Sequence, residues 1–396
     1  MIMGRVEPFS IEFSDHELTE LLSRVGQTAN DLADGVSNWK CPRDQAHFEQ
    51  LCQYWSHEFN WKKQQQNLNQ IPQFTLNIDG VRVHFVHVRA VGGNGVPLLL
   101  AHSCPGTFLE YVPAISMLTD QRRHGLTGPA FDVVIPSIPG FGFSERPRGS
   151  TWSYAHTAKL WHRLMDELGY SRIAAVGTGF GAGIVTMMAQ QQPKRLIGIY
   201  LNSLDVSRPP CASQALSTAE MLSLAQSDAW ENAEVSVDTG PMAKSNMLSF
   251  ALTESPIGIA AWIVQQWRVW AGPEADLSDR RDYYALLTML SLYWLTGTVG
   301  SSLLDYYDNR AEPPLLEPGT KIDVPTSATV FSDPGSCRSR EWMTELYQLE
   351  SLIEVPRVGR FGVSHDPQCL SSGIGGLVQK VMSRDGNASL YFGGEA

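Results

Sequence analysis

The sequence predicts an α/β protein with a doubly wound, mostly parallel sheet, an inserted helical cap and an N-terminal helical arm. Short apolar runs alternate with helical patterns between residues 96 and 201, which is typical of parallel strands joined by helices. The alternation stops after Asp205 and resumes at residues 325–331. We therefore assign residues 1–72 to the arm, 73–206 and 311–396 to the α/β core, and 207–310 to the cap.

Composition excludes several classes of function. The net charge of −11 leaves no basic stripe for nucleic acid. The six cysteines form no CxxC pair and no metal-type spacing with histidine, so we expect no metal site, no cofactor and a reducing compartment. The N-terminus is too polar for a signal peptide, and no apolar run is long enough to cross a membrane. We expect a cytoplasmic protein without a membrane partner; a homodimer stays open.

In the arm, helical patterning begins near Asp15, which we expect to cap the first helix. Residues 74–78 and 81–88 alternate like antiparallel strands joined by a turn at Asp79-Gly80. Residues 96–101 and 131–136 are continuous apolar runs, as expected for strands buried on both faces, and a helix is predicted over 152–169.

Residues 173–183 (IAAVGTGFGAG) form the segment around which the predicted fold is organised. They predict a buried strand, a tight glycine-rich turn, a helix beginning near Ala182 and, after it, a strand at 196–201. A strand that enters a helix through glycines has the geometry of a nucleophile elbow, where a strained turn raises one side chain into a pocket. The residue at that position is Gly179, so the elbow carries no side chain.

The second half of the chain is predicted to hold cap helices at 213–227, 256–270 and 282–299, because their apolar residues recur at helical spacing. The sheet is expected to resume at 325–331 and 352–355. A terminal helix over 373–382 closes the core.

Several motifs together resemble the microsomal-type epoxide hydrolases of the α/β-hydrolase superfamily, including their N-terminal arm. The resemblance extends from Phe9 to about Leu377. It rests on residues 78–80 (IDG), 102–106 (HSCPG), 139–144 (PGFGFS), 252–256 (LTESP) and, most specifically, 293–298 (YWLTGT). It implies the α/β-hydrolase fold. Members of this group that have lost catalytic residues resemble tailoring enzymes of natural-product pathways, including those that form carbon–carbon bonds in anthraquinone-fused enediynes.

The resemblance also implies a mechanism. An Asp at the elbow attacks an epoxide carbon and forms an ester, and a His backed by an acid activates water to hydrolyse that ester. This chain has Gly179 in place of the nucleophile and Arg360 in place of the base, and the acid position falls near Asp333. Arginine stays protonated and cannot serve as a general base.

The remaining family positions concern the substrate's oxygen. Of the two cap tyrosines that donate hydrogen bonds to it, one corresponds to Tyr306 and the other falls near Val237. The oxyanion turn carries Ser103 in place of the usual glycine, and the N–H groups of Cys104 and Phe180 could still form the oxyanion hole.

We expect His102, Ser103, Phe143 and Trp294 to contact the substrate, although His102 usually braces the turn in this family. A pocket bordered by Phe143, Phe180, Trp294 and Tyr306 would suit a bulky aromatic or polycyclic molecule. The same residues would also make an ordinary core.

Three hypotheses follow. The first is a non-hydrolytic enzyme that polarises an epoxide and promotes ring opening or cyclisation, with Tyr306, Arg360 and Asp333 in the site. The second is a catalytically inactive binding or scaffold protein. The third is a hydrolase with another nucleophile, such as Cys104.

Overall fold

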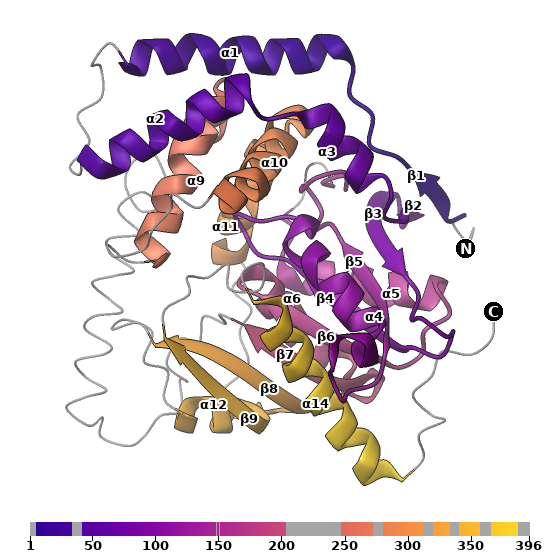
Figure 1. Ribbon diagram of the computed structural model, residues 1–396. Helices are drawn as coiled ribbons and strands as arrows, with labels where there is room; N and C mark the ends of the chain where they lie inside the picture. The colour runs from indigo at the N-terminus through magenta and orange to yellow at the C-terminus, as the bar shows by residue number, and fades with distance from the viewer. Residues whose placement is uncertain are drawn as a thin grey trace.

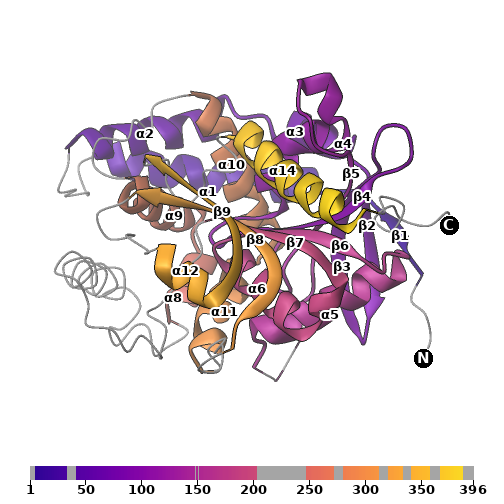
Figure 2. The ribbon, with the colours of Figure 1, turned by 90° about the horizontal axis from the view of Figure 1, so that it is seen from below.

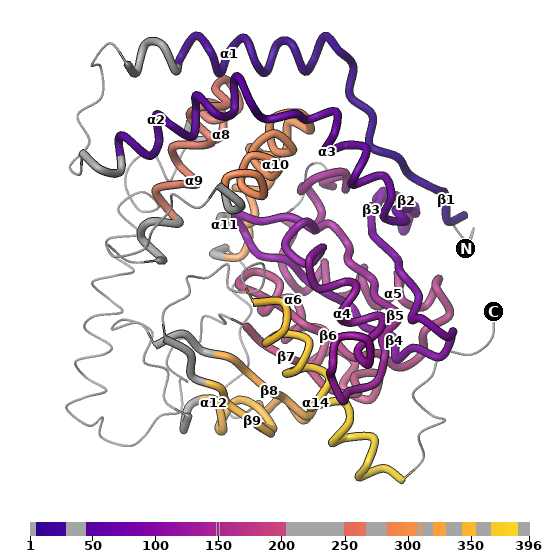
Figure 3. The backbone as a smooth tube through the Cα atoms, in the orientation of Figure 1, coloured from indigo at the N-terminus to yellow at the C-terminus, as the bar shows by residue number. Residues whose placement is uncertain are grey.

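The computed structural model describes residues 5–33, 42–147, 149, 151–202, 247–271, 280–311, 320–332, 340–356 and 366–386 (Figure 3). The predicted helix over 213–227 and the boundary at 206/207 lie outside these ranges, so that helix and the division into domains stay predictions. No helix of the described residues is long and apolar enough to cross a membrane.

A nine-stranded sheet forms the centre of the described fold, in the order β1-β2-β3-β5-β4-β6-β7-β8-β9. β1, β2, β3 and β5 pair antiparallel, and every pair from β5 to β9 is parallel. The strands are β1 (Glu7–Phe9), β2 (Gln73–Ile78), β3 (Val81–Val88), β4 (Val96–Ala101), β5 (Phe131–Pro136), β6 (Ile173–Thr178), β7 (Leu196–Asn202), β8 (Ile322–Ser332) and β9 (Tyr347–Pro356).

Helices cover both faces of the sheet (Figures 1 and 2), and the other helices are named here after the predicted arm and cap. The arm holds α1 (Asp15–Ala33), α2 (Pro42–His57) and α3 (Trp61–Leu68). The core holds α4 (Ile115–Thr119), α5 (Tyr154–Glu167), α6 (Phe180–Gln191), α12 (Arg340–Leu346) and α14 (Pro367–Asp385), with 3-10 turns η1 (Phe108–Ala114), η2 (Gln121–His124) and η3 (Pro193–Arg195). The cap holds α8 (Met247–Thr253), α9 (Pro256–Ala271), α10 (Arg280–Thr296) and α11 (Val299–Ala311).

The predicted α/β-hydrolase fold is confirmed. β4, β5 and β6 are buried along their whole length, which explains why their sequences are apolar without alternation. Two details differ from the expectation. α6 begins at Phe180, directly after Gly179, rather than near Ala182. At the start of α1 the cap is Ser14 rather than Asp15, because the Ser14 Oγ accepts from the Glu17 N–H (3.3 Å) and the Glu17 carboxylate accepts from the Ser14 N–H (2.7 Å).

The arm lies over the cap helices, with α1 against α9 and α10 (Figure 1). A buried hydrogen bond of 3.0 Å from Trp55 Nε1 to Ser291 Oγ joins α2 to α10. At its other end the arm adds β1 to the edge of the sheet beside β2. The arm therefore holds the cap and the sheet in one arrangement.

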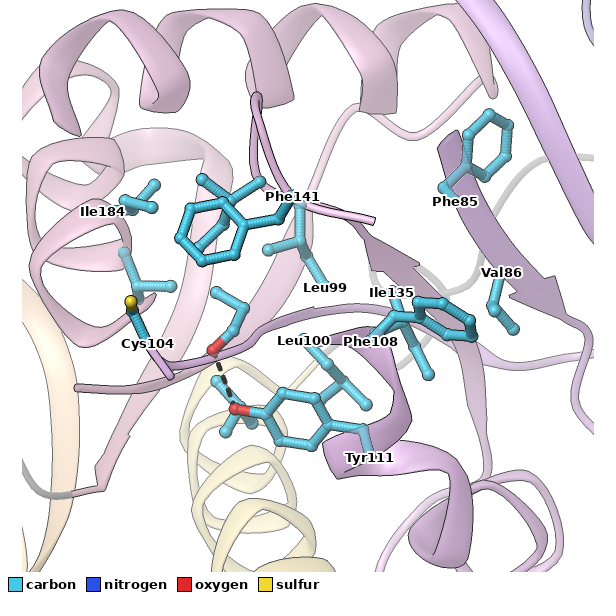
Figure 4. Close-up of a cluster of buried hydrophobic side chains, with 14 of the residues drawn as sticks. Phe85, Val86, Leu99, Leu100, Cys104, Phe108, Tyr111, Ile135, Phe141 and Ile184 are labelled. Carbon is cyan, nitrogen blue, oxygen red and sulfur yellow. Dashed lines mark hydrogen bonds between the residues drawn. The ribbon is translucent and has the colours of Figure 1, made fainter. Parts of the chain in front are cut away.

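A cluster of buried hydrophobic side chains surrounds the end of β4. Figure 4 shows Leu99 and Leu100 of β4 among Phe108, Phe141 and Ile135. The Tyr111 hydroxyl of η1 donates to the Ala101 carbonyl at 2.8 Å and lies 2.9 Å from Thr178 Oγ1. These two bonds tie the ends of β4 and β6 to one side chain and fix the edge where the site lies.

Candidate active site

The sharp turn between β6 and α6 is centred on Gly179, with φ 53° and ψ −115°. This backbone conformation is strained for a residue with a side chain. The turn is held by hydrogen bonds from Gly179 N to the Asn202 carbonyl (3.2 Å) and from Ala182 N to the Gly179 carbonyl (3.0 Å). The strand–turn–helix geometry expected of an elbow is therefore present in full.

Two flanking glycines let α6 approach the sheet closely. A Cβ added at Gly181 would lie 2.0 Å from the Ala101 carbonyl oxygen, and one at Gly177 would lie 2.3 Å from the Gly181 carbonyl oxygen. Both contacts are with backbone, which cannot move aside. The glycine-rich pattern in the sequence is thus explained by packing on either side of the elbow.

The turn after β4 lies directly against the elbow. A Cβ added at Gly179 would lie 2.3 Å from Ser103 Oγ and 3.3 Å from Ser103 Cβ. Ser103 is 3% exposed. β4 and β6 are parallel neighbours with Ala101 opposite Gly177, so the residues two positions further on meet at the same edge. The Ser103 hydroxyl consequently occupies the space into which a side chain at position 179 would begin to extend.

His102 is fully buried, and both of its ring nitrogens are engaged. Nδ1–H donates to the Ser103 carbonyl at 2.9 Å, and Nε2 accepts from the Ile138 N–H at 3.0 Å. Burial lowers the pKa of His102 to about 4, with the Ser103 carbonyl opposing the change. The ring is therefore neutral and braces two turns. It has no nitrogen left for a substrate, so the geometry favours the bracing role over the predicted contact with substrate.

Glu110 is a buried carboxyl group that the sequence analysis did not single out. Its Oε2 accepts from the Ser103 N–H at 2.8 Å, and its Oε1 has no hydrogen-bond partner among the described residues. Burial raises the pKa of Glu110 to about 8, with the Ser103 N–H acting in the opposite direction. Glu110 is therefore mostly protonated at neutral pH and fixes the turn that carries Ser103.

Cys104 is 5% exposed and precedes a cis bond to Pro105. In Figure 4 its side chain points toward α6, where Ile184 lies. Phe180, the first residue of α6, stacks at a tilt against Tyr154, with ring centroids 5.5 Å apart. Both residues adjoin the elbow as an oxyanion hole would require, and that role stays a prediction.

The cap is anchored to the oxyanion turn by Tyr293. Its hydroxyl donates to the Gly106 carbonyl at 2.8 Å and accepts from the Gly106 N–H at 3.2 Å. Residues 293–298 were the most specific motif in the sequence, and this pair of bonds gives its first residue a structural role.

A second anchor joins the cap to the loop after β5. Arg146 donates to the carboxylates of Asp305 and Asp308 on α11, and its Nη1 also donates to the Ser301 carbonyl at 3.1 Å. The Trp152 N–H donates to Asp308 Oδ2 at 2.8 Å. Nothing in the sequence marked this contact, because its partners are more than 150 residues apart.

Two aromatic residues predicted to contact the substrate face the arm. The Phe143 ring lies 4.7 Å from that of Phe9 and 5.2 Å from that of His84. The Trp294 ring lies beneath the Arg24 guanidinium, 5.3 Å from its Cζ. Both residues therefore contribute to the packing of the arm, which is the ordinary-core alternative.

Three predicted site residues cannot be placed at side-chain level. Tyr306 belongs to α11, but its side chain lies outside the described residues, and Asp333 and Arg360 lie outside them altogether. Within the described ranges, no three His, Cys, Asp or Glu side chains come together in an arrangement that could hold a metal ion.

Comparison with known proteins gives the wider context. A family model described as "Epoxide hydrolase N terminus" matches residues 6–111, and one described as "alpha/beta hydrolase fold" matches residues 96–256. A Stigmatella aurantiaca protein named for the epoxide hydrolases is 33% identical, covering 91% of this chain and 82% of its own. Epoxide hydrolase 1 of Oryctolagus cuniculus is 30% identical, covering 93% of this chain and 88% of its own.

The chain belongs to the epoxide hydrolase family. Solved structures agree on the fold: the Aspergillus niger epoxide hydrolase superposes with a TM-score of 0.77 at 23% identity, covering 95% of this chain and 97% of that one. The juvenile hormone epoxide hydrolase of Bombyx mori gives 0.79 at 22% identity, covering 96% of each chain.

This epoxide hydrolase family member has an N-terminal arm, a strained elbow backbone and two sets of hydrogen bonds that join the cap to the core. What the elbow holds at its apex is a glycine whose side-chain space is taken by Ser103.

Proposed function

We propose that this chain is an epoxide-hydrolase-like enzyme that does not hydrolyse its substrate. It binds an epoxide or a similar electrophile within a bulky, aromatic or polycyclic intermediate and polarises the electrophile's oxygen. A carbon or oxygen nucleophile within the substrate then opens the ring, so the product is an isomer of the substrate. Natural-product tailoring is the setting that fits such a reaction.

One observation carries this proposal. The elbow keeps its strained geometry, yet its apex is Gly179, and a side chain there would collide with Ser103 Oγ. An enzyme-derived ester at this position is therefore excluded both by the lack of a nucleophile and by the lack of space.

The sequence supports the same proposal at the second half of the hydrolytic cycle. Arg360 stands where the family's base is expected, and arginine does not deprotonate in proteins. A chain that cannot form the ester has no use for a group that hydrolyses it. Without the nucleophile and the base, the electrophile is also protected from hydrolysis. A cyclase requires that protection.

The polarising side of the site depends on α11. Arg146 and Tyr293 join the cap to the core close to the elbow, and α11 carries Tyr306. We assign Tyr306 the role of hydrogen-bond donor to the substrate's oxygen.

The test is the mass of the product formed in water enriched in oxygen-18. Polycyclic aryl epoxides that carry a tethered hydroxyl group can each give an isomeric cyclised product or a diol formed by addition of water. We expect unlabelled isomers, formed faster than in buffer, with turnover lowered by Tyr306→Phe. Labelled diols would contradict the proposal and favour a hydrolase with another nucleophile. A melting shift with these epoxides but no consumption would favour the inactive binding protein.

A variant that restores the nucleophile gives an independent check. Gly179→Asp combined with Ser103→Gly supplies a carboxylate and the room for it. Because the base position still holds Arg360, the ester should persist, and intact-protein mass should rise by one epoxide. Ser103→Gly alone is the matched control and should take up nothing. A double variant that instead releases diol would show that water activation is intact.

A further inference from the structure

Among the described residues, the atom nearest to a Cβ at position 179 is the hydroxyl oxygen of Ser103. Its distance of 2.3 Å from that Cβ position means that Oγ stands where the first atoms of a nucleophilic side chain would stand. The Ser103 hydroxyl, from the turn after β4, therefore fills the space of a side chain at position 179.

The backbone of Ser103 is fixed on both sides. Its N–H donates to Glu110 Oε2 at 2.8 Å, and its carbonyl accepts from His102 Nδ1–H at 2.9 Å. Its Oγ, in contrast, forms no hydrogen bond with any residue that the structure describes. A hydroxyl that is held in place while keeping its own hydrogen-bonding capacity is suited to binding a substrate group.

Ser103 is not placed to act as a nucleophile itself. Activation would require a base within hydrogen-bond reach of Oγ. His102 uses both nitrogens on backbone groups, and its low pKa makes it a poor proton acceptor. Glu110 is directed at the Ser103 N–H rather than at Oγ. The hydroxyl therefore remains a neutral hydrogen-bonding group.

Ring opening of an epoxide requires attack on carbon from the side opposite the breaking C–O bond. In this family's scheme the cap donors hold the oxygen and the elbow faces the back of the carbon. With Gly179 at the elbow, the substrate's own nucleophile must occupy that back side, which brings it next to Ser103 Oγ.

We propose that Ser103 is a catalytic residue whose Oγ accepts a hydrogen bond from the hydroxyl of the substrate's internal nucleophile and aligns it with the epoxide carbon. This inference rests on the proposed function and specifies its substrate class: an epoxide tethered to a phenol or enol. The bond from the nucleophile to carbon forms as the C–O bond breaks. The epoxide oxygen takes the electron pair and ends with the proton that the nucleophile loses, so the serine is unchanged.

A small phenol-tethered epoxide, 2-(oxiran-2-ylmethyl)phenol, tests the inference. Its cyclisation gives an isomer, whereas hydrolysis adds one water. We expect the wild-type protein to accelerate cyclisation and Ser103→Ala to lower kcat/KM by about 10- to 100-fold, because alignment of the attacking group is lost. The melting temperature should stay unchanged, since alanine removes only a hydroxyl that has no hydrogen-bond partner among the described residues.

Ser371→Ala is the matched control, because Ser371 is also a fully buried serine whose Oγ has no partner among the described residues, and it lies on α14. It should leave turnover unchanged. The methyl ether of the probe supplies a second comparison that needs no variant. It lacks the O–H group, so wild-type protein should bind it about 5- to 50-fold more weakly than the phenol, and Ser103→Ala should abolish that difference.

The outcomes separate the two proposals. Cyclisation by wild type and Ser103→Ala at equal rates, with equal preference for phenol over ether, would overturn the role of Ser103 and leave the proposed function standing. Formation of the hydrolysed product by wild type would overturn the proposed function. Absence of turnover together with equal binding of phenol and ether would overturn both.

Discussion

Replacing Arg146 by alanine should strongly destabilise the protein. The Arg146 side chain is 11% exposed and bridges the carboxylates of Asp305 and Asp308, whose side chains are 2% and 19% exposed. It also donates to the Ser301 carbonyl. Without it, Asp305 is left buried without its cation. Removing one partner of a buried ion pair costs about 3–5 kcal/mol.

The unfolding free energy lost on Arg146→Ala should increase with pH. Burial raises the pKa of Asp305 to about 7, and Arg146 opposes that rise, so its removal raises the pKa further. A carboxyl group with a raised folded-state pKa stabilises the protein at low pH and loses that contribution as pH rises through the folded pKa. The cost of Arg146→Ala should therefore be smaller at pH 5, where Asp305 can be neutral, than at pH 8.

Urea unfolding at pH 5 and pH 8 measures the cost of Arg146→Ala in unfolding free energy. Asp305→Asn completes a double-mutant cycle. We expect a coupling above about 1.5 kcal/mol at pH 8, since neutral asparagine no longer needs the cation. Arg146→Lys keeps the charge but cannot bridge both carboxylates, so about 1.5–3 kcal/mol should be lost. A cost below about 1 kcal/mol for Arg146→Ala, or equal costs with Asp305 and with Asn at position 305, would refute the reasoning.

Two further predictions concern the elbow. Gly179→Ala adds a Cβ that would lie 2.3 Å from Ser103 Oγ, at a backbone conformation that is strained for alanine. Calorimetric melting should show that adding Ser103→Gly recovers about 1–3 kcal/mol of unfolding free energy by relieving the overpacking, and that about 1–3 kcal/mol of backbone strain remains. If Gly179→Ala costs the same unfolding free energy with serine and with glycine at position 103, the contact is contradicted. Glu110 has a pKa raised from 4.5 to about 8, so the folded protein binds more protons than the unfolded chain in that window and its stability falls as pH rises. Between pH 4.5 and 8, the unfolding free energy of Glu110→Gln should fall by roughly 4–5 kcal/mol less than that of the wild type. If both proteins show the same dependence of unfolding free energy on pH, Glu110 is ionised throughout this range.

The sequence predicted most of the sheet because its signals are local. The apolar runs at β4 and β5 and the Asp79-Gly80 turn depend on neighbouring residues alone. β1 was missed because three residues at a sheet edge, partly exposed, carry no periodic pattern. The elbow could be predicted because its glycines cluster in the sequence. They cluster because the close packing of the turn on itself and on the end of β4 leaves no room for Cβ atoms.

The contacts of the site were less accessible to sequence reasoning. Glu110 and Arg146 gain their roles from partners on other elements, and a single buried or partly buried charge has no periodicity to reveal it. For aromatic residues, the sequence alone could not decide between a pocket and an ordinary core. Phe143 and Trp294 have the composition of a hydrophobic pocket, and only the position of the arm decides that they pack against Phe9 and Arg24.

The side chains at positions 103 and 179 compete for one space. β4 and β6 are parallel and adjacent, with Ala101 opposite Gly177, so their following turns share one space at the sheet edge. That space holds one side chain. With Ser103 on the turn after β4, only glycine fits at position 179 without displacing the hydroxyl. A change at either position alone leaves a cavity or a collision, whereas the two together leave a packed elbow that carries a hydroxyl group.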